Sequence, residues 1–121
     1  MSRRILVVED QEDNRRILRD LLTSAGYEII QAENGEEALA AAARERPDLI
    51  LMDIQLPLLD GYEATRRIKA DPELRAIPII AVTSYALSGY EGKARAAGCD
   101  AYVSKPYSPR ALLAKIREYV P

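Results

Sequence analysis

The chain of 121 residues is 48% apolar and 30% charged, which predicts one soluble folded domain with a single core and excludes a disordered chain. Its formal net charge of −2 lacks the basic excess of a nucleic-acid-binding surface, and no apolar run is long enough for a membrane-spanning helix. The single cysteine excludes an internal disulfide and fits the reducing cytoplasm, and the absence of histidine excludes a His-based triad, a His metal site and a phosphohistidine on this chain.

Five short apolar runs alternate along the chain with segments of helical spacing. The runs cover residues 5–8, 28–32, 49–52, 79–82 and 102–104. Strands that alternate with helices build a parallel sheet with helices on both faces. We therefore predict an α/β fold, a single flavodoxin-like (βα)5 domain over residues 1–121, with its five-stranded parallel sheet in the order 2-1-3-4-5.

The first two helices are predicted from their caps and their apolar spacing. Asp13 is expected to cap the first helix, and Gly26 to close it. The inward residues of this helix are expected to be Ile17, Leu18, Leu21, Leu22 and Ala25. Asn34 and Gly35 open the second helix, which ends before Pro47. Its inward residues are expected to be Ala38, Leu39, Ala42 and Ala43.

The remaining helices carry their own start signals. Asp60 with Glu63 forms a capping-box-like start for the third helix. A weaker fourth helix falls within residues 87–97, and Ser108 with Pro109 is a strong start for the last helix. Three basic pairs are predicted to be solvated surface: Arg3-Arg4, Arg15-Arg16 and Arg66-Arg67.

Polar residues follow each of the five apolar runs, and those after four of the runs are candidates for one site. They are Glu9 and Asp10 after the first run, Asp53 after the third, Thr83 after the fourth and Lys105 after the last. Ligands of open parallel sheets bind outside the carboxyl ends of the strands, and the order 2-1-3-4-5 puts the first and third strands side by side. The three carboxylates are therefore expected to meet at one edge of the sheet.

Three neighbouring carboxylates need cations, because two unit charges about 4 Å apart repel by roughly 4 kcal/mol at an effective dielectric constant near 20. Lys105 supplies one positive charge, and Mg²⁺ suits a site of carboxylates, waters and a phosphoryl oxygen. Asp53 is the candidate nucleophile, since a carboxylate fixed at the end of a central strand can attack phosphorus to form an acyl phosphate. The Thr83 hydroxyl and nearby backbone N–H groups would add hydrogen bonds to the phosphoryl oxygens.

The residues around these strand ends resemble a known family. The patterns are V-V-E-D, then L-I-L-M-D-I-Q-L-P-x-x-D-G, then A-V-T-S and A-Y-V-S-K-P. Together they look like the receiver domain of two-component response regulators, with the stand-alone CheY-like members as the nearest architecture. These sequence patterns are also similar to those of DivK-like single-domain regulators and of receiver modules of hybrid kinases.

The resemblance implies a role for each residue at the strand ends. Asp53 would be the phosphoacceptor, and Asp10 and Asp53 would bind Mg²⁺ directly, with the backbone carbonyl of Gln55 as a third ligand and Glu9 acting through water. Lys105 would contact the phosphoryl group. In the same way, the resemblance makes Thr83 the switch hydroxyl and Tyr102 the switch aromatic.

The partners are expected to be proteins. With no histidine in the chain, the donor would be the phosphohistidine of a sensor histidine kinase or a histidine phosphotransfer protein. A downstream protein target would read a face that changes shape on phosphorylation, and neither nucleic acid nor a membrane is expected as a partner. The exposed part of that face is predicted to include Tyr85, Leu87, Tyr90, Tyr102 and Tyr107. The chain would be a switch that takes part in its own phosphorylation and slow dephosphorylation, not a turnover enzyme.

Four alternatives stay open at this stage. A haloacid-dehalogenase-type phosphatase also uses a strand-end aspartate with Mg²⁺, but it needs a second aspartate where this chain has Gln55. A receiver that no longer phosphorylates would not need the intact set of acids, hydroxyl and lysine. A receiver module excised from a hybrid histidine kinase or a larger regulator would have the same sequence features. A nucleotide-binding flavodoxin-like protein would need a glycine-rich loop after the first strand, which is absent.

Overall fold

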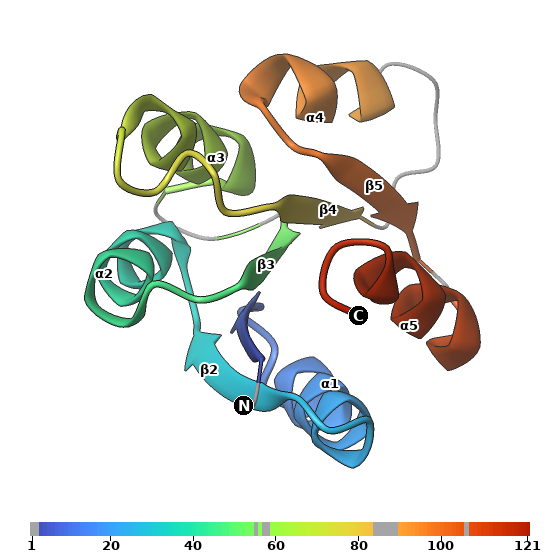
Figure 1. The fold of residues 1–121 in the computed structure, drawn as a ribbon. Helices are drawn as coiled ribbons and strands as arrows, with labels where there is room; N and C mark the ends of the chain where they lie inside the picture. The colour runs from blue at the N-terminus through green and yellow to red at the C-terminus, as the bar shows by residue number, and fades with distance from the viewer. Residues whose placement is uncertain (1–2, 55, 57–58, 84–89, 106) are drawn as a thin grey trace.

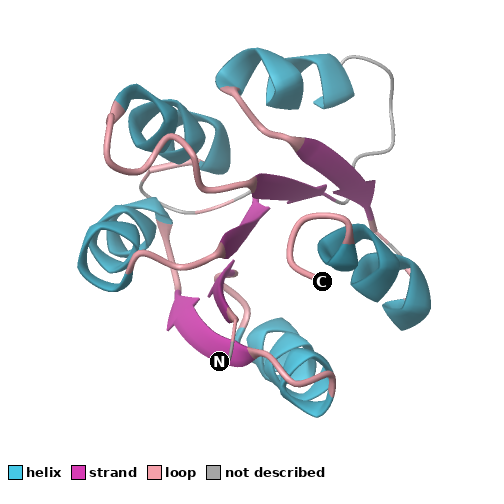
Figure 2. Ribbon diagram, viewed as in Figure 1, coloured by secondary structure: helices cyan, strands magenta, loops and turns pink. Residues whose placement is uncertain are grey.

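The computed structural model describes residues 3–54, 56, 59–83, 90–105 and 107–121. Strands and helices alternate along the chain (Figures 1 and 2). They are β1 (Arg4–Val8), α1 (Glu12–Ser24), β2 (Glu28–Ala32), α2 (Gly35–Glu45), β3 (Leu49–Asp53), α3 (Gly61–Ala70), β4 (Ile79–Thr83), α4 (Tyr90–Ala97), β5 (Ala101–Ser104) and α5 (Pro109–Arg117). The sheet order is β2-β1-β3-β4-β5 and every neighbouring pair is parallel, so the predicted fold is confirmed.

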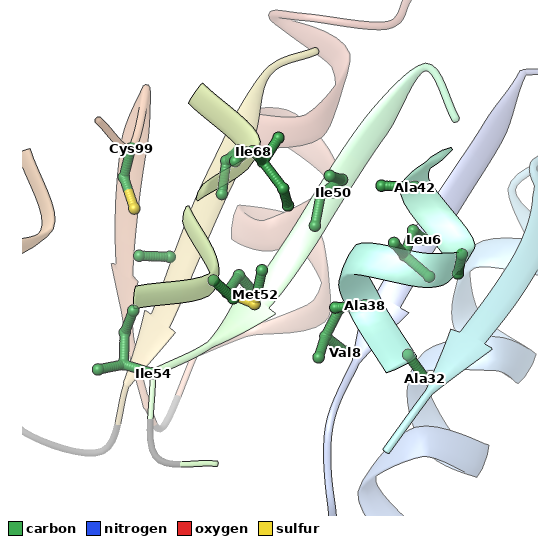
Figure 3. Close-up of a cluster of buried hydrophobic side chains, with 14 of the residues drawn as sticks. Leu6, Val8, Ala32, Ala38, Ala42, Ile50, Met52, Ile54, Ile68 and Cys99 are labelled. Atoms are coloured by element: carbon green, nitrogen blue, oxygen red, sulfur yellow. The ribbon is translucent and has the colours of Figure 1, made fainter. Parts of the chain in front are cut away.

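Helices cover both faces of the sheet, with α2, α3 and α4 on one side and α1 and α5 on the other (Figure 1). The central strand β3 is buried along its whole length, and its side chains alternate between the two faces. Ile50 and Met52 pack toward α2 and α3 (Figure 3), whereas Leu49 and Leu51 pack toward α1 and α5. This double burial explains why the strand reads as a continuous apolar run.

The strand register brings the carboxyl ends of four strands to one edge. Val8 pairs with Met52 across β1 and β3, so Glu9 follows β1 at the level where Asp53 ends β3. Asp53 pairs with Val82 on β4, and Thr83 pairs with Ser104 on β5. The residues that follow these strands therefore lie at the same edge, as predicted.

Three of the predicted helix starts are confirmed by their capping hydrogen bonds. The Asn34 side chain accepts a hydrogen bond from Glu37 N at 2.9 Å, and Asp60 accepts from Glu63 N at 2.9 Å. Ser108 Oγ accepts from Ala111 N at 3.0 Å, with a proline in the first turn of α5. Each cap satisfies a backbone N–H that has no partner within its helix.

Two expectations for α1 are wrong. The helix begins at Glu12, after Gln11, so Asp13 lies inside the first turn and bonds to Arg16 instead of capping. Ile17 is 62% exposed, although its spacing suggested the core. The helix packs through Leu18 and Leu22, with Leu21 and Ala25 partly buried beside them, and Ile17 is not part of this hydrophobic cluster.

The inward face of α2 also differs by one residue from the prediction. Ala43 is exposed and Ala41 is buried in its place, next to Ala38 and Ala42. A run of alanines has no size difference between its positions, so the sequence pattern does not fix which ones face the core. No helix in the part of the chain that the structure describes is both long and apolar enough to cross a membrane.

Candidate functional site

Three carboxylates meet at the carboxyl edge of the sheet. Glu9 and Asp10 follow β1, Asp53 ends β3, and one oxygen from each lies within 4.8 Å of the others. Glu9 is 2% exposed and Asp53 6%, whereas Asp10 is half-buried. Backbone hydrogen bonds fix the chain at both buried acids, since Glu9 N donates to Ala32 O at 3.1 Å and Ile54 N, directly after Asp53, donates to Val82 O at 3.1 Å.

Lys105 supplies a positive charge inside this cluster. Its Nζ lies 3.1 Å from Glu9 Oε1 and 3.5 Å from Asp53 Oδ2. Its backbone N donates to Thr83 O at 2.6 Å, which anchors the residue next to the end of β4. Burial of Lys105 disfavours its charge, but Asp53 and Glu9 together outweigh this effect and raise the pKa of the ammonium. The lysine is therefore held protonated in the cluster.

The acids carry more negative charge than Lys105 offsets. Burial raises the pKa of the Asp10 carboxyl above its usual range, and the hydrogen bond and the negative charge of Glu9 raise it further. A cation at this point would relieve that repulsion. The donor set of clustered carboxylate oxygens, half open to solvent at Asp10, fits a hard divalent ion such as Mg²⁺.

The predicted hydroxyl and aromatic residues lie on the neighbouring strands. Thr83 ends β4 and is fully buried. Tyr102 is half-buried on β5 and packs against the hydrophobic core between the sheet and helices α2, α3 and α4. Tyr107 packs against the hydrophobic core on the opposite side of the sheet, near α1 and α5. The two tyrosines therefore pack on opposite faces of the sheet, on either side of the edge strand β5, and the prediction that both belong to one partner surface stays a prediction.

Several predicted residues lie outside the described part of the chain. They are Gln55, Tyr85 and Leu87, together with the side chain of Tyr90 at the start of α4. Their expected roles stay predictions.

An open groove of about 300 Å³ lies beside the acidic cluster, lined by Asn14, Ile17, Lys105 and Tyr107. Ile17 is the one large exposed apolar side chain among the residues that the structure describes. Burial raises the pKa of the Tyr107 hydroxyl, and the positive charge of Lys105 lowers it in part. The groove therefore lies between the exposed Ile17 of α1 and a lysine that contacts Asp53.

Two residues of the site were not recognised from the sequence. The Arg15 side chain is 11% exposed and contacts the backbone carbonyl of Glu9 and the carboxylate of Glu33. Its assignment to solvated surface was therefore wrong. Gly61 opens α3 so close to β3 that a Cβ there would clash with the carbonyl oxygen of Asp53. Gly61 stands in the quoted pattern L-P-x-x-D-G, but neither that pattern nor the basic pair Arg15-Arg16 indicated a role for these two residues in the site.

Known proteins match the chain over nearly its whole length. The profile of the "Response regulator receiver domain" family matches residues 5–117. The chain is 49% identical over 120 residues to the polar-differentiation response regulator DivK of Brucella anthropi, an alignment that covers 99% of this chain and 98% of that protein. DivK of Brucella ovis is 48% identical with the same coverage.

Solved structures of receiver domains also resemble this chain. The receiver domain of a sensor histidine kinase from Pseudomonas aeruginosa, solved with a magnesium ion coordinated in its active site cleft, is 38% identical with a TM-score of 0.92 and covers 99% of this chain and 98% of that one. The chemotaxis protein CheY4 of Vibrio cholerae is 28% identical with a TM-score of 0.92, covering 98% and 99%. A phosphatase of the haloacid-dehalogenase type finds no support. The chain belongs to the response regulator receiver domain family, whose members act in two-component signalling.

Proposed function

We propose that Asp53 accepts a phosphoryl group from the phosphohistidine of a partner protein and that the charged product switches a protein-binding surface. The observation that carries the proposal is the position of Asp53. It ends the central strand, nearly buried, with Lys105 Nζ 3.5 Å from its Oδ2 and two further acids beside it. A carboxylate with a fixed backbone and an adjacent cation is suited to phosphoryl transfer, which depends mainly on positioning and charge neutralisation.

In the transfer, a carboxylate oxygen of Asp53 attacks phosphorus while the P–N bond of the donor breaks, and the imidazole nitrogen keeps the electron pair of that bond. Lys105 would form an ion pair with the phosphoryl oxygens, exchanging part of its contact with Glu9 for the new charge. The acyl phosphate carries roughly two negative charges at neutral pH. Bound Mg²⁺ would neutralise charge on the phosphoryl oxygens.

Four groups are proposed to hold the ion. Asp10 and Asp53 would bind it directly, Glu9 through water, and the backbone carbonyl of Gln55 would complete the protein ligands. The clustering of the three carboxylate oxygens within 4.8 Å supports this assignment. Mg²⁺ retains several waters and uses only one or two carboxylates. Because the buried Glu9 is paired to Lys105, the carboxylates of Asp10 and Asp53 are left to bind the ion directly.

The donor is proposed to be a sensor histidine kinase or a histidine phosphotransfer protein, because this chain has no histidine. Ile17 and the groove beside Lys105 are the proposed contact for that donor, since they adjoin the acceptor. A downstream protein would bind the phosphorylated form. We infer that Thr83 moves toward the phosphoryl group and that Tyr102 responds, which makes the domain a switch without turnover of a small substrate.

Radiolabelling with acetyl phosphate in Mg²⁺ tests the proposal. The Asp53→Asn variant should take up no label, because the amide cannot form an acyl phosphate. Asp60→Asn is the matched control, since Asp60 caps a nearby helix and asparagine caps equally well. Undiminished labelling of Asp53→Asn would move the acceptor to another residue.

A further inference from the structure

Arg15 connects three separate segments around the acidic cluster. From α1, its Nη1 donates to the backbone carbonyls of Glu9 at 2.8 Å and Asp10 at 3.2 Å. Its Nη2 pairs with Glu33 Oε1 at 3.1 Å, in the turn between β2 and α2. The Arg15 side chain is 11% exposed, compared with 57% for the neighbouring Arg16. This arginine is therefore built into the site, unlike its neighbour.

The geometry of these contacts is specific to a guanidinium group. One planar fork of N–H donors reaches two consecutive carbonyls on one side and a carboxylate on the other. The carbonyls belong to Glu9 and Asp10, whose side chains form two of the three corners of the carboxylate cluster. Fixing both peptide groups fixes the directions in which the two side chains leave the backbone.

The charge of Arg15 is balanced within the same set of contacts. An uncompensated cation behind the carboxylates would oppose the binding of a second cation there. Glu33 pairs with the guanidinium and offsets its charge, while its own side chain stays 59% exposed. The pair can thus hold the loop without adding net positive charge behind the cluster.

We infer that Arg15 is a positioning residue that orients Glu9 and Asp10 for Mg²⁺, and that Glu33 keeps its charge from opposing the ion. The inference rests on the proposed function, because it assumes that the cluster binds Mg²⁺. Groups that orient metal ligands typically change metal affinity by 10–100-fold when they are mutated. Arg15 would act in this way on the backbone of the ligands.

Calorimetric titration with Mg²⁺ alone tests the inference on the unphosphorylated chain. Arg15→Lys keeps the charge but cannot form the fork, so it should weaken Mg²⁺ binding about tenfold, and Arg15→Gln should weaken it at least as much. Arg16→Gln is the matched control, one residue away and exposed, and should leave the affinity unchanged. Circular dichroism identifies the folded variants, and Arg15→Lys decides the question if Arg15→Gln does not fold.

Salt separates positioning from charge. Glu33→Gln leaves the charge of Arg15 unbalanced, so it should weaken Mg²⁺ binding at low salt and match the wild type in about 1 M NaCl, where charges are screened beyond roughly 3 Å. The deficit of Arg15→Lys should persist at both salt concentrations. Wild-type affinity in Arg15→Lys, or tighter binding in Arg15→Gln, would overturn the inference.

The same titration distinguishes the two proposals. If the wild type binds Mg²⁺ and is labelled at Asp53 but Arg15→Lys binds equally well, only the role of Arg15 fails. If the wild type binds no Mg²⁺, both the metal assignment and the role of Arg15 fail. If Asp53→Asn still takes up label while Arg15→Lys loses affinity for Mg²⁺, the acceptor assignment fails and the role of Arg15 stands.

Discussion

Lys105 and Glu9 form an ion pair at 3.1 Å, although 96 positions separate them in the chain. The pair joins the end of β5 to the end of β1 across the intervening strands β3 and β4. Lys105 also reaches Asp53, so one side chain links the outer edge of the sheet to its centre. A change in the charge of the site should therefore change the free energy of unfolding of the whole domain.

We expect Lys105→Met to lower the free energy of unfolding by about 2–3 kcal/mol at pH 7 without Mg²⁺, because it leaves the buried Glu9 without its cation. Saturating Mg²⁺ should shrink that deficit by supplying positive charge to the same acids. Urea unfolding measures both effects. Lys115→Met removes a surface pair with Glu118 and should change the stability by less than about 1 kcal/mol. If the loss of stability in Lys105→Met is the same with and without Mg²⁺, the ion and the lysine do not act on the same acids.

The buried Thr83 is expected to be needed for the response to phosphorylation but not for phosphorylation itself. Thr83→Ala should take up label at Asp53 and lose the shift of the Tyr102 amide resonance that phosphorylation causes in the wild type. Thr83→Ser keeps the hydroxyl and should retain the shift. A full switch from 1:99 to 99:1 takes about 5.5 kcal/mol, which a few charge-assisted hydrogen bonds can supply. An unchanged Tyr102 response in Thr83→Ala would remove the hydroxyl from the switch.

Gly61→Ala should destabilise the domain by about 1–3 kcal/mol, because the added methyl group would clash with the backbone of Asp53. Labelling at Asp53 should fall as well, since the clash displaces the acceptor strand. Gly92→Ala is the matched control on α4. A Cβ there meets nothing within 4 Å, and the change should stabilise by up to about 1 kcal/mol. Equal stability of both variants would contradict the close packing of α3 on β3.

Cys99 should make the stability of the domain depend on alkaline pH. Burial raises the pKa of its thiol above the ordinary value of 9.0, although Thr65 lowers it in part. The folded state thus favours the neutral thiol, and this contribution is complete below about pH 9 and is lost as the pH rises through the folded-state pKa. Urea unfolding at pH 7 and about pH 10 should show a larger loss for the wild type than for Cys99→Ala. Equal losses would exclude the contribution of the thiol.

Ile17→Ser should slow transfer from a phosphorylated donor protein by about tenfold, the effect of losing one well-placed apolar contact. Labelling by acetyl phosphate should be unchanged, because the small donor needs no docking surface. Ala40→Ser alters an exposed position on α2, across the sheet, and should affect neither reaction. If Ile17→Ser slows both donors equally, the residue supports the site and not the docking of a partner.

The sheet and the acidic cluster could be predicted because each depends on local signals. Every strand contains a short run of apolar residues, and the acids follow two of those runs directly. Once the parallel order is inferred, the carboxyl ends must share one edge, and Asp10 and Asp53 must be neighbours. The capping residues Asn34, Asp60 and Ser108 act on backbone groups three positions away, so they too are legible in the sequence.

The features that could not be predicted depend on what lies across a tertiary contact. Ile17 has a core-like spacing, but it is exposed while its neighbour Leu18 is buried, so its exposure depends on which face α1 turns to the sheet. Arg15 looks like a surface arginine because its partners are backbone carbonyls of a loop, which carry no sequence signal. Gly61 is explained only by the approach of α3 to the backbone of Asp53.

Whether Asp53 is the metal-dependent phosphoacceptor is tested by mapping the acyl phosphate on the wild-type chain after acetyl phosphate treatment, with and without Mg²⁺. Borohydride reduction followed by peptide mass spectrometry identifies the modified carboxylate. We expect one modified residue, Asp53, only when Mg²⁺ is present. Modification at another acid, or equal modification of Asp53 after chelation of the metal, would contradict that expectation.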